Sequence, residues 1–558
     1  MSPLSPLSSL KGFRSLAVAM AAMLSLAAVA AADAGIAWKQ AASDADVDAA
    51  FAQARAEQKP VFVYWGAKWC PPCNQVQATL FNRQDFIERS RAFVPVYVDG
   101  DRPGAQKLGA RFKVAGYPTM VLFNAQGTEL TRLPGEVEAE QYTQVLTLGM
   151  NAQRPVKAVL ADARTGGEPA RGLTPNDWKL LAFYSWETDE QQVVPKEGVA
   201  ALLRQLADAC PAGQPETAAR LLLKAAAASG IASGSAPAAK PGAKAAALPA
   251  APADAATRIQ VLRLLADPAR PRVHMDVLTN NAADLARALS AAHTPERAEL
   301  VAALNTALKR LAADTTLSRA DRMTAVIAQV DLAKLGAAQN AKTPLGAKAA
   351  RQVLPDTLLA EVRDHTARAD RDITDGYERQ AVITTAAYML GQAGLLDESD
   401  TLLKANLAKS HSPYYLMSGL AGNAKMRGDK AGALRWYEQA FNKSEGPATR
   451  LQWGAAYVGA LVELAPHDEG RIEKAAQQVL AEAAAQPNAF YERSARSLQR
   501  VGSRLQSWNQ GARHARTITR LQAQLESVCQ RLDSADPQRP TCEALLKPAP
   551  KAPPKQAA

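Results

Sequence analysis

Histidine and cysteine are scarce in this chain, which has six histidines and five cysteines in 558 residues. A closed zinc site needs four such ligands, often as pairs at short spacing. No two of the histidines have the spacing that places ligands on one helix face; they are His274, His293, His365, His411, His467 and His514. A second cysteine pair at short spacing is absent as well. We therefore expect no resident metal and no cofactor.

A strong excess of one charge is also missing. The formal net charge is +11, with 65 basic and 54 acidic residues. A nucleic-acid interface would gather lysines and arginines on one face among aromatic residues, and no segment shows that pattern. The composition thus argues against nucleic-acid binding.

Long apolar runs are absent after residue 34. The first 34 residues carry Lys11 and Arg14, an apolar stretch over residues 16–32, and a small-residue end, Ala32-Asp33-Ala34. This order is typical of a secretory signal peptide, and an uncleaved anchor is the alternative. We expect a mature chain without a stable membrane span, exported to the periplasm, where disulfides persist.

Residues 35–150 alternate helical and strand patterns and predict an α/β domain with a central mixed sheet flanked by helices. The central strand is expected over 60–66, a helix over 70–82, a second strand over 93–99, and a hairpin formed by 120–123 and 128–133. A last helix is expected over 136–148.

Residues beyond 150 show helical periodicity and almost no strand signal, so we expect an all-α second half. The predicted segments are helical regions 151–229 and 257–375, a flexible linker 230–256, tetratricopeptide-like repeats 376–510, a C-terminal helix 511–546 and a disordered tail 547–558. The repeat rests on an offset of 34 residues that aligns Gly394 with Gly428. A plain helical bundle is the alternative. Stacked repeats expose a binding surface, so this half is expected to recruit a client or partner protein.

Cys70 and Cys73 are the most informative residues of the chain. The motif Trp69-Cys70-Pro71-Pro72-Cys73 follows the apolar run Val61-Phe62-Val63-Tyr64, so a strand leads to two cysteines at a helix start. Two intervening residues on the first turn bring both sulfurs to one face, where a disulfide can form and break. The helix dipole and the Cys73 backbone N–H favour the thiolate of Cys70, which is the attacking form. Pro71 and Pro72 preset helical dihedrals but remove two backbone donors.

These residues, with Gly116-Tyr117-Pro118-Thr119 about 45 residues later, resemble the thioredoxin superfamily. The similarity covers residues 37–150. It is closest to secreted or membrane-tethered thioredoxin domains, in which the strand before the cysteines begins with a sequence like Lys59-Pro60-Val61. It implies that Cys70 attacks, Cys73 resolves, and Pro118 is a cis-proline facing the sulfurs. Trp69, Tyr117 and Pro118 are the expected substrate contacts; the expected supporting residues are Pro71, Pro72, Tyr64 and Lys68.

Two residues depart from the family pattern. Tyr64 stands where thioredoxins often hold a buried aspartate that takes the proton of the resolving cysteine, so water, a group such as Glu129, or the substrate must take it. Tyr117 is bulky where substrate backbone normally pairs, which restricts the clients. Residues 35–150 also contain no histidine, so the thiolate form lacks the strong stabilisation of a highly oxidising site.

The remaining cysteines are Cys210, Cys529 and Cys542. We predict a structural disulfide between Cys529 and Cys542 and a buried free thiol at Cys210; pairing of Cys210 with a C-terminal cysteine is the alternative.

The sequence thus predicts an exported protein thiol–disulfide oxidoreductase, acting as a reductase or isomerase. Its partners would be disulfide-bearing client proteins and a redox partner that supplies electrons. The alternative is a protein-binding scaffold whose thioredoxin fold is redox-inactive or handles copper.

Overall fold

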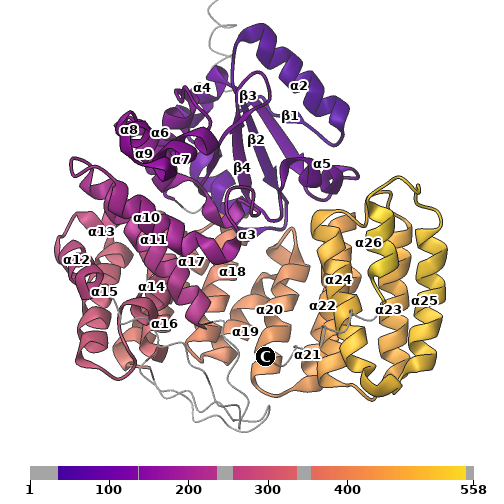
Figure 1. Cartoon of the computed structure of the whole chain (residues 1–558). Helices are drawn as coiled ribbons and strands as arrows, with labels where there is room; N and C mark the ends of the chain where they lie inside the picture. Colours follow the sequence, from indigo (N-terminus) through magenta and orange to yellow (C-terminus); the bar gives the residue numbers. More distant parts are fainter. Residues whose placement is uncertain (1–34, 136, 235–254, 336–353, 548–558) are drawn as a thin grey trace, which may run out of the picture.

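The computed structural model of the chain describes residues 35–135, 137–234, 255–335 and 354–547 (Figure 1). The predicted signal peptide, the tail after Lys547 and most of the predicted linker lie outside the described residues. Where the linker is described it is helical, because α11 continues to Gly234 and α12 begins at Ala255. The helices thus extend into the predicted linker at both ends, over residues 230–234 and 255–256, so its predicted boundaries are wrong.

An α/β domain forms the N-terminal part, as predicted. Its elements are β1 (Lys39–Gln40), α2 (Asp44–Glu57), β2 (Val61–Gly66), α3 (Pro71–Val76), the π-helical turn η1 (Gln77–Phe81), α4 (Gln84–Arg89), η2 (Ser90–Ala92), β3 (Val94–Asp99), α5 (Ala105–Phe112), β4 (Thr119–Phe123), β5 (Glu129–Leu133) and α6 (Ala139–Met150). The strand order is β1-β3-β2-β4-β5, with β1, β3 and β2 parallel and the β4–β5 hairpin antiparallel.

Strand β2 is buried along its whole length because helices cover both faces of the sheet. Val61, Val63 and Trp65 pack in the core that contains residues of α2 and α5. Phe62 and Tyr64 point to the opposite face, as the alternation of a strand requires, and pack with residues of α3, α4 and α6. This alternation places Tyr64 beneath the helix that carries Cys73.

The rest of the described chain is helical, as predicted. The first group of elements is α7 (Val156–Thr165), α8 (Gly167–Arg171), α9 (Pro175–Phe183), η3 (Trp186–Thr188), η4 (Lys196–Gly198), α10 (Val199–Ala209), α11 (Pro215–Gly234), α12 (Ala255–Ala266), α13 (Arg270–Val273), α14 (Met275–Leu289), α15 (Pro295–Ala313), α16 (Arg319–Leu335) and α17 (Asp356–Asp372). The second is α18 (Gly376–Gln392), α19 (Leu396–Asn406), η5 (Leu407–Lys409), α20 (Pro413–Met426), α21 (Lys430–Lys443), α22 (Pro447–Leu464), α23 (Glu469–Ala484), α24 (Glu492–Trp508), η6 (Gln510–Ala512), α25 (Ala515–Cys529) and α26 (Gln538–Ala544).

The helices from α18 to α23 follow one another as packed pairs. Gly394 and Gly428, which the offset of 34 residues aligns, both adopt a positive φ (81° and 79°) in the turns after α18 and α20. Glycine adopts this conformation without steric cost. The turns are thus equivalent, while the tetratricopeptide character of the pairs stays a prediction.

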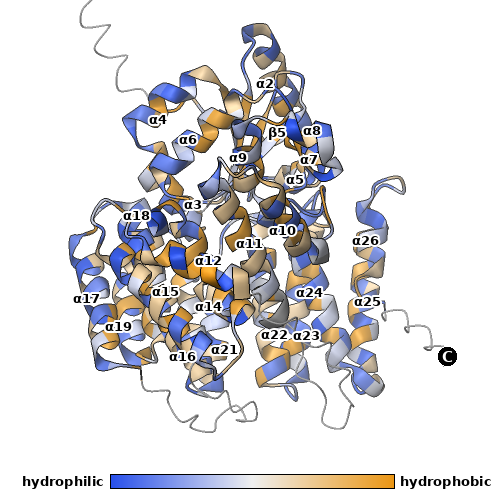
Figure 2. Cartoon of the chain, turned by 60° about the vertical axis from the view of Figure 1, so that its left-hand side comes forward, coloured by the Kyte–Doolittle hydropathy of each residue, from blue (hydrophilic) through white to orange (hydrophobic). Residues whose placement is uncertain are grey.

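The helices carry apolar residues toward one another and polar residues toward solvent (Figure 2). Within the described residues, no helix is both long and apolar enough to span a bilayer.

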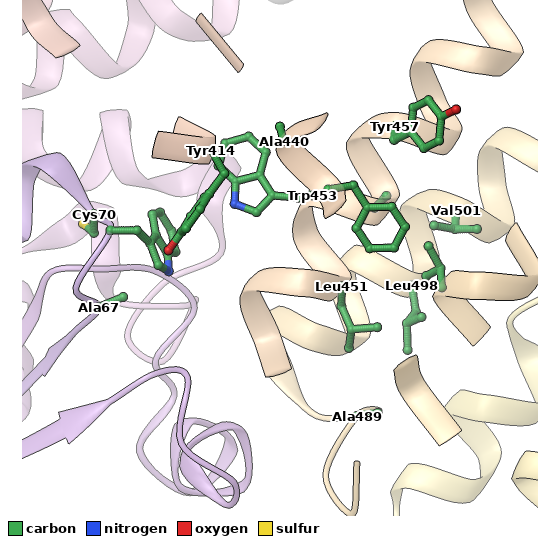
Figure 3. Packing of buried hydrophobic residues seen from close by; sticks show 14 of the residues in the cluster. Ala67, Cys70, Tyr414, Ala440, Leu451, Trp453, Tyr457, Ala489, Leu498 and Val501 are labelled. Carbon is green, nitrogen blue, oxygen red and sulfur yellow. The ribbon is translucent and has the colours of Figure 1, made fainter. Parts of the chain in front are cut away.

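The N-terminal domain sits against the arc of helices from α11 to α26 (Figure 1). Helix α3 packs against α18, and α5 packs against α24. One hydrophobic core runs from Phe62 through Cys70 and Trp453 to Leu498, so the two parts share buried surface. Figure 3 shows Tyr414 and Trp453 between Cys70 and the helices farther along the chain.

A dithiol site roofed by the helical half

Cys70 is the N-cap of α3, and the loop before it is fixed by backbone and side-chain bonds. Its N–H donates to the Ala67 carbonyl (3.1 Å). The buried Asn74 amide donates to the carbonyls of Lys68 (2.9 Å) and Cys70 (2.8 Å). Pro71 and Pro72 occupy the first turn, where a missing N–H costs no helical bond. The sequence therefore holds Cys70 at the positive end of the helix.

The two cysteines are free thiols that face each other across the first turn. The Cys73 N–H donates to Cys70 Sγ (3.4 Å), the bond expected to stabilise a thiolate there. Cys70 Sγ also donates to the Tyr117 carbonyl (3.6 Å). The two residues are 3% and 4% exposed, so both sulfurs are almost closed off from solvent.

The Tyr117–Pro118 peptide bond is cis and lies beside the sulfurs. Strand β4 runs antiparallel to β2 with Thr119 opposite Trp65, so Pro118 faces the loop that leads to Cys70. The structure thus places Cys70, Cys73, Trp69, Tyr117 and Pro118 together. Lys68 is exposed next to them, and it contributes its backbone carbonyl to the loop.

Tyr64 lies on the face of the sheet that packs against α3, and its hydroxyl is close enough to Cys73 to influence the pKa of that thiol. Burial raises the pKa of Cys73 well above its ordinary value, and the neighbouring Cys70 raises it further. Burial likewise raises the pKa of Tyr64, which therefore stays neutral and cannot replace a carboxylate as a base. Glycine at position 66 leaves room for this hydroxyl, because a Cβ there would collide with it.

Glu129 is not placed to take the Cys73 proton. It pairs with Phe123 at the end of β4 remote from Pro118. Its carboxylate is held by the buried Arg132 guanidinium (2.8 Å). This candidate base is wrong, and water or the client remains as the proton acceptor.

Asp101 joins the site to the helical half. The Trp69 Nε1–H donates to one carboxylate oxygen (2.8 Å). The Thr449 N–H and hydroxyl at the start of α22 donate to the same carboxylate (2.8 and 2.7 Å). Burial raises the pKa of Asp101 although three donors favour the ionised form.

Aromatic and cationic side chains of the helical half complete the site. Tyr415 stacks on Trp69 with ring centroids 6.1 Å apart, and Trp453 packs edge-on to Tyr415 at 5.7 Å. The Arg493 guanidinium lies over the rings of Trp69 (5.0 Å) and Tyr117 (5.1 Å). Sequence reasoning missed Asp101, Tyr415, Trp453 and Arg493, since no local motif marks them.

The remaining cysteines lie apart from this site. Cys529 and Cys542 form a disulfide that links α25 to α26. Cys210 is a free, partly buried thiol, and burial raises its pKa to about 11. The alternative pairing of Cys210 with a C-terminal cysteine is therefore wrong.

Among the described residues, no three His, Cys, Asp or Glu side chains gather where they could share a metal ion. The chemistry that the site can perform with its own atoms is sulfur exchange at Cys70, with Cys73 as the second thiol.

Comparison with known proteins agrees with this geometry. Residues 47–149 match the family described as a thioredoxin-like domain, so the chain carries such a domain followed by a large helical region. The thiol:disulfide interchange protein DsbD of Pseudomonas fluorescens is 29% identical over 106 residues, 18% of each chain. DsbD of Yersinia pestis is 32% identical over 98 residues, 17% of this chain and 16% of the relative. The chain thus spans less than a fifth of the length of these relatives.

Proposed function

We propose that the chain is an exported protein thiol–disulfide oxidoreductase that works in the periplasm as a reductase or isomerase. The observation that carries the proposal is the bond from the Cys73 N–H to Cys70 Sγ at the start of α3. This bond favours the thiolate of Cys70, which attacks, and it places the Cys73 thiol one helical turn away, where it can react next. The distant relatives that are named as thiol:disulfide interchange proteins support the same chemistry.

The reaction follows from the two thiols. The Cys70 thiolate attacks a client disulfide, forms a mixed disulfide, and releases the client's second sulfur as a thiolate that takes up a proton. Cys73 then loses its proton and attacks Cys70 Sγ, which forms the Cys70–Cys73 disulfide and frees the client's first thiol. Two electrons and two protons pass to the client, and a dithiol-bearing redox partner returns them.

The helical half is proposed to recruit the client through tetratricopeptide-like pairs. Its contacts with Trp69 and Tyr117 support this role, because any client at Cys70 also meets α18, α20, α22 and α24.

Insulin reduction by the chain after removal of residues 1–34 tests the proposal. Cys70→Ser should abolish turnover, and Cys73→Ser should accumulate mixed disulfides that a reductant releases. Cys210→Ser is the matched control, since that free thiol lies outside the site, and it should behave like the unchanged chain.

A chain that leaves insulin intact and traps nothing as Cys73→Ser would overturn the proposal. Partner binding that survives Cys70→Ser would then support the scaffold alternative. Cell fractionation of the full chain tests the periplasmic location, which a cytoplasmic protein pool would contradict.

A further inference from the structure

A cavity of about 1160 Å³ lies between Cys70 and the helical half. The N-terminal domain contributes Trp69, Cys70, Pro71, Pro72 and Tyr117 to its wall. Helices α18, α19, α20, α22 and α24 contribute the opposite wall. The cavity is slightly larger than typical small-ligand pockets, which measure about 300 to 1,000 Å³. A folded domain of 100 residues has a radius of gyration of about 13 Å and cannot enter it.

The charged side chains in the wall of this cavity are both basic. They are Lys425 and Arg493, and within the described part of the chain no aspartate or glutamate lines it. Lys425 is paired with Glu463 (2.8 Å). Arg493 donates to the Gln452 amide oxygen (3.0 Å) and forms no ion pair with any described residue. An uncompensated cation therefore stands over the rings beside Cys70, where a client carboxylate would be its natural partner.

Two large apolar side chains in the cavity wall reach solvent. Tyr388 of α18 is 54% exposed and Met426 of α20 is 55% exposed. Exposed apolar groups at the edge of a concave site favour contact with a polypeptide, and methionine adapts to varied side chains.

We propose that this cavity binds an extended segment of a non-native client, with an acidic residue next to its disulfide cysteine and an apolar residue farther along. In an extended chain, successive side chains rise by about 3.3 Å and alternate in direction. The acidic side chain meets Arg493 while the apolar one contacts Tyr388 and Met426. This inference rests on the proposed function and adds its substrate class.

The test compares rates of reduction for two short unstructured peptides that each contain one disulfide. They differ in a single residue beside the cysteine, which is Glu in one and Lys in the other. We expect the reduced chain to have kcat/KM about tenfold higher for the Glu peptide, with the preference declining at high salt. Arg493→Gln should bring the ratio close to one, and Arg493→Lys should retain most of it.

Arg91→Gln is the matched control, because Arg91 is exposed and lies outside the cavity wall, and the peptide preference should persist. Tyr388→Ser with Met426→Ser should raise KM for both peptides, and both sites tolerate the change because they are exposed. A protein that holds the Glu-peptide disulfide in its folded surface should react at least tenfold more slowly than the free peptide.

Equal rates for the two peptides, or for the folded and free forms, would overturn the inference. Hydroxyethyl disulfide, which is small and neutral, separates this result from failure of the proposed function. A chain that reduces it but shows no peptide preference has the proposed activity without the inferred client class. A chain that reduces none of these disulfides lacks the activity itself.

Discussion

The indole of Trp69 and the hydroxyl of Thr449 hydrogen-bond the same carboxylate, that of Asp101. Trp69 directly precedes Cys70, and Thr449 lies in the first turn of α22, 348 residues beyond Asp101. The residue beside the redox sulfur is therefore held in place through a contact with the helical half. Docking of the two parts and the geometry of the site depend on each other.

Thr449→Val should weaken this docking. Valine has the shape of threonine but lacks the donor, so a buried acceptor loses one bond at a cost of about 1 to 2 kcal/mol. Hydrogen exchange of the Trp69 loop and of the start of α22 should accelerate together. Thr519→Val is the control, since that exposed hydroxyl bonds only its own helix. Unchanged exchange in both segments would mean that Asp101 does not join them.

Asp101→Ala should be more harmful than Asp101→Asn. Alanine leaves the Trp69 and Thr449 donors without an acceptor, whereas the asparagine oxygen still accepts one bond; we expect a difference of about 1 to 2 kcal/mol. Urea unfolding followed by tryptophan fluorescence measures it. Equal losses for the two variants would contradict the assigned hydrogen bonds.

Tyr64→Phe should slow the second step of the reaction. Burial raises the pKa of Cys73 and the nearby Tyr64 hydroxyl lowers it. If the hydroxyl donates to the Cys73 thiolate during the second step, a bond to a charged group is worth about 1.5 to 3 kcal/mol, or roughly tenfold or more in rate. Phenylalanine keeps the buried ring in place, so the fold should persist. Quenched-flow mass spectrometry should show a longer-lived mixed disulfide at Cys70. A lifetime equal to that of the unchanged chain would exclude this role for the hydroxyl.

The decay of the mixed disulfide should accelerate with pH. Burial raises the pKa of Cys73 well above its ordinary value, so its thiol is largely protonated at neutral pH. The reactive thiolate fraction then grows about tenfold for each pH unit below that pKa. Between pH 7 and 9 we expect log rate to rise with a slope near one. A flat profile would contradict this rate-limiting deprotonation. It would indicate that the client thiolate released in the first step takes the Cys73 proton within the complex.

Loss of the C-terminal disulfide should lower the free energy of unfolding without changing the reactivity of Cys70 and Cys73. Cys529 and Cys542 are 13 residues apart, and closing such a loop contributes about 3 kcal/mol in the chain-entropy model. The double variant with Ala at both positions should unfold at lower urea, beginning at α25 and α26. Its rate with hydroxyethyl disulfide should match the unchanged chain, and a large rate loss would mean that these helices influence the site.

The sequence by itself determined the local structure around the two cysteines. The apolar strand before Cys70, the two prolines and the short spacing fix the helix start, because those effects act within one turn. Strand alternation likewise fixed the side of the sheet that Tyr64 occupies. The helix predicted over 70–82 runs from Pro71 to Phe81 and includes a π-helical turn at Gln77–Phe81, which no single residue type signals.

Only the tertiary structure decided what surrounds the sulfurs. Arg493 and Asp101 reach the site through contacts between segments hundreds of residues apart, as in the bond from the Arg493 N–H to Gln106 387 residues away. Periodicity shows which face of a helix is apolar but not which distant element covers that face. The helical half was expected to bind another protein, and the structure shows that part of its surface also holds the N-terminal domain. Long-range packing, which a local sequence pattern does not encode, places the helical half over Cys70 and Cys73 and buries both side chains.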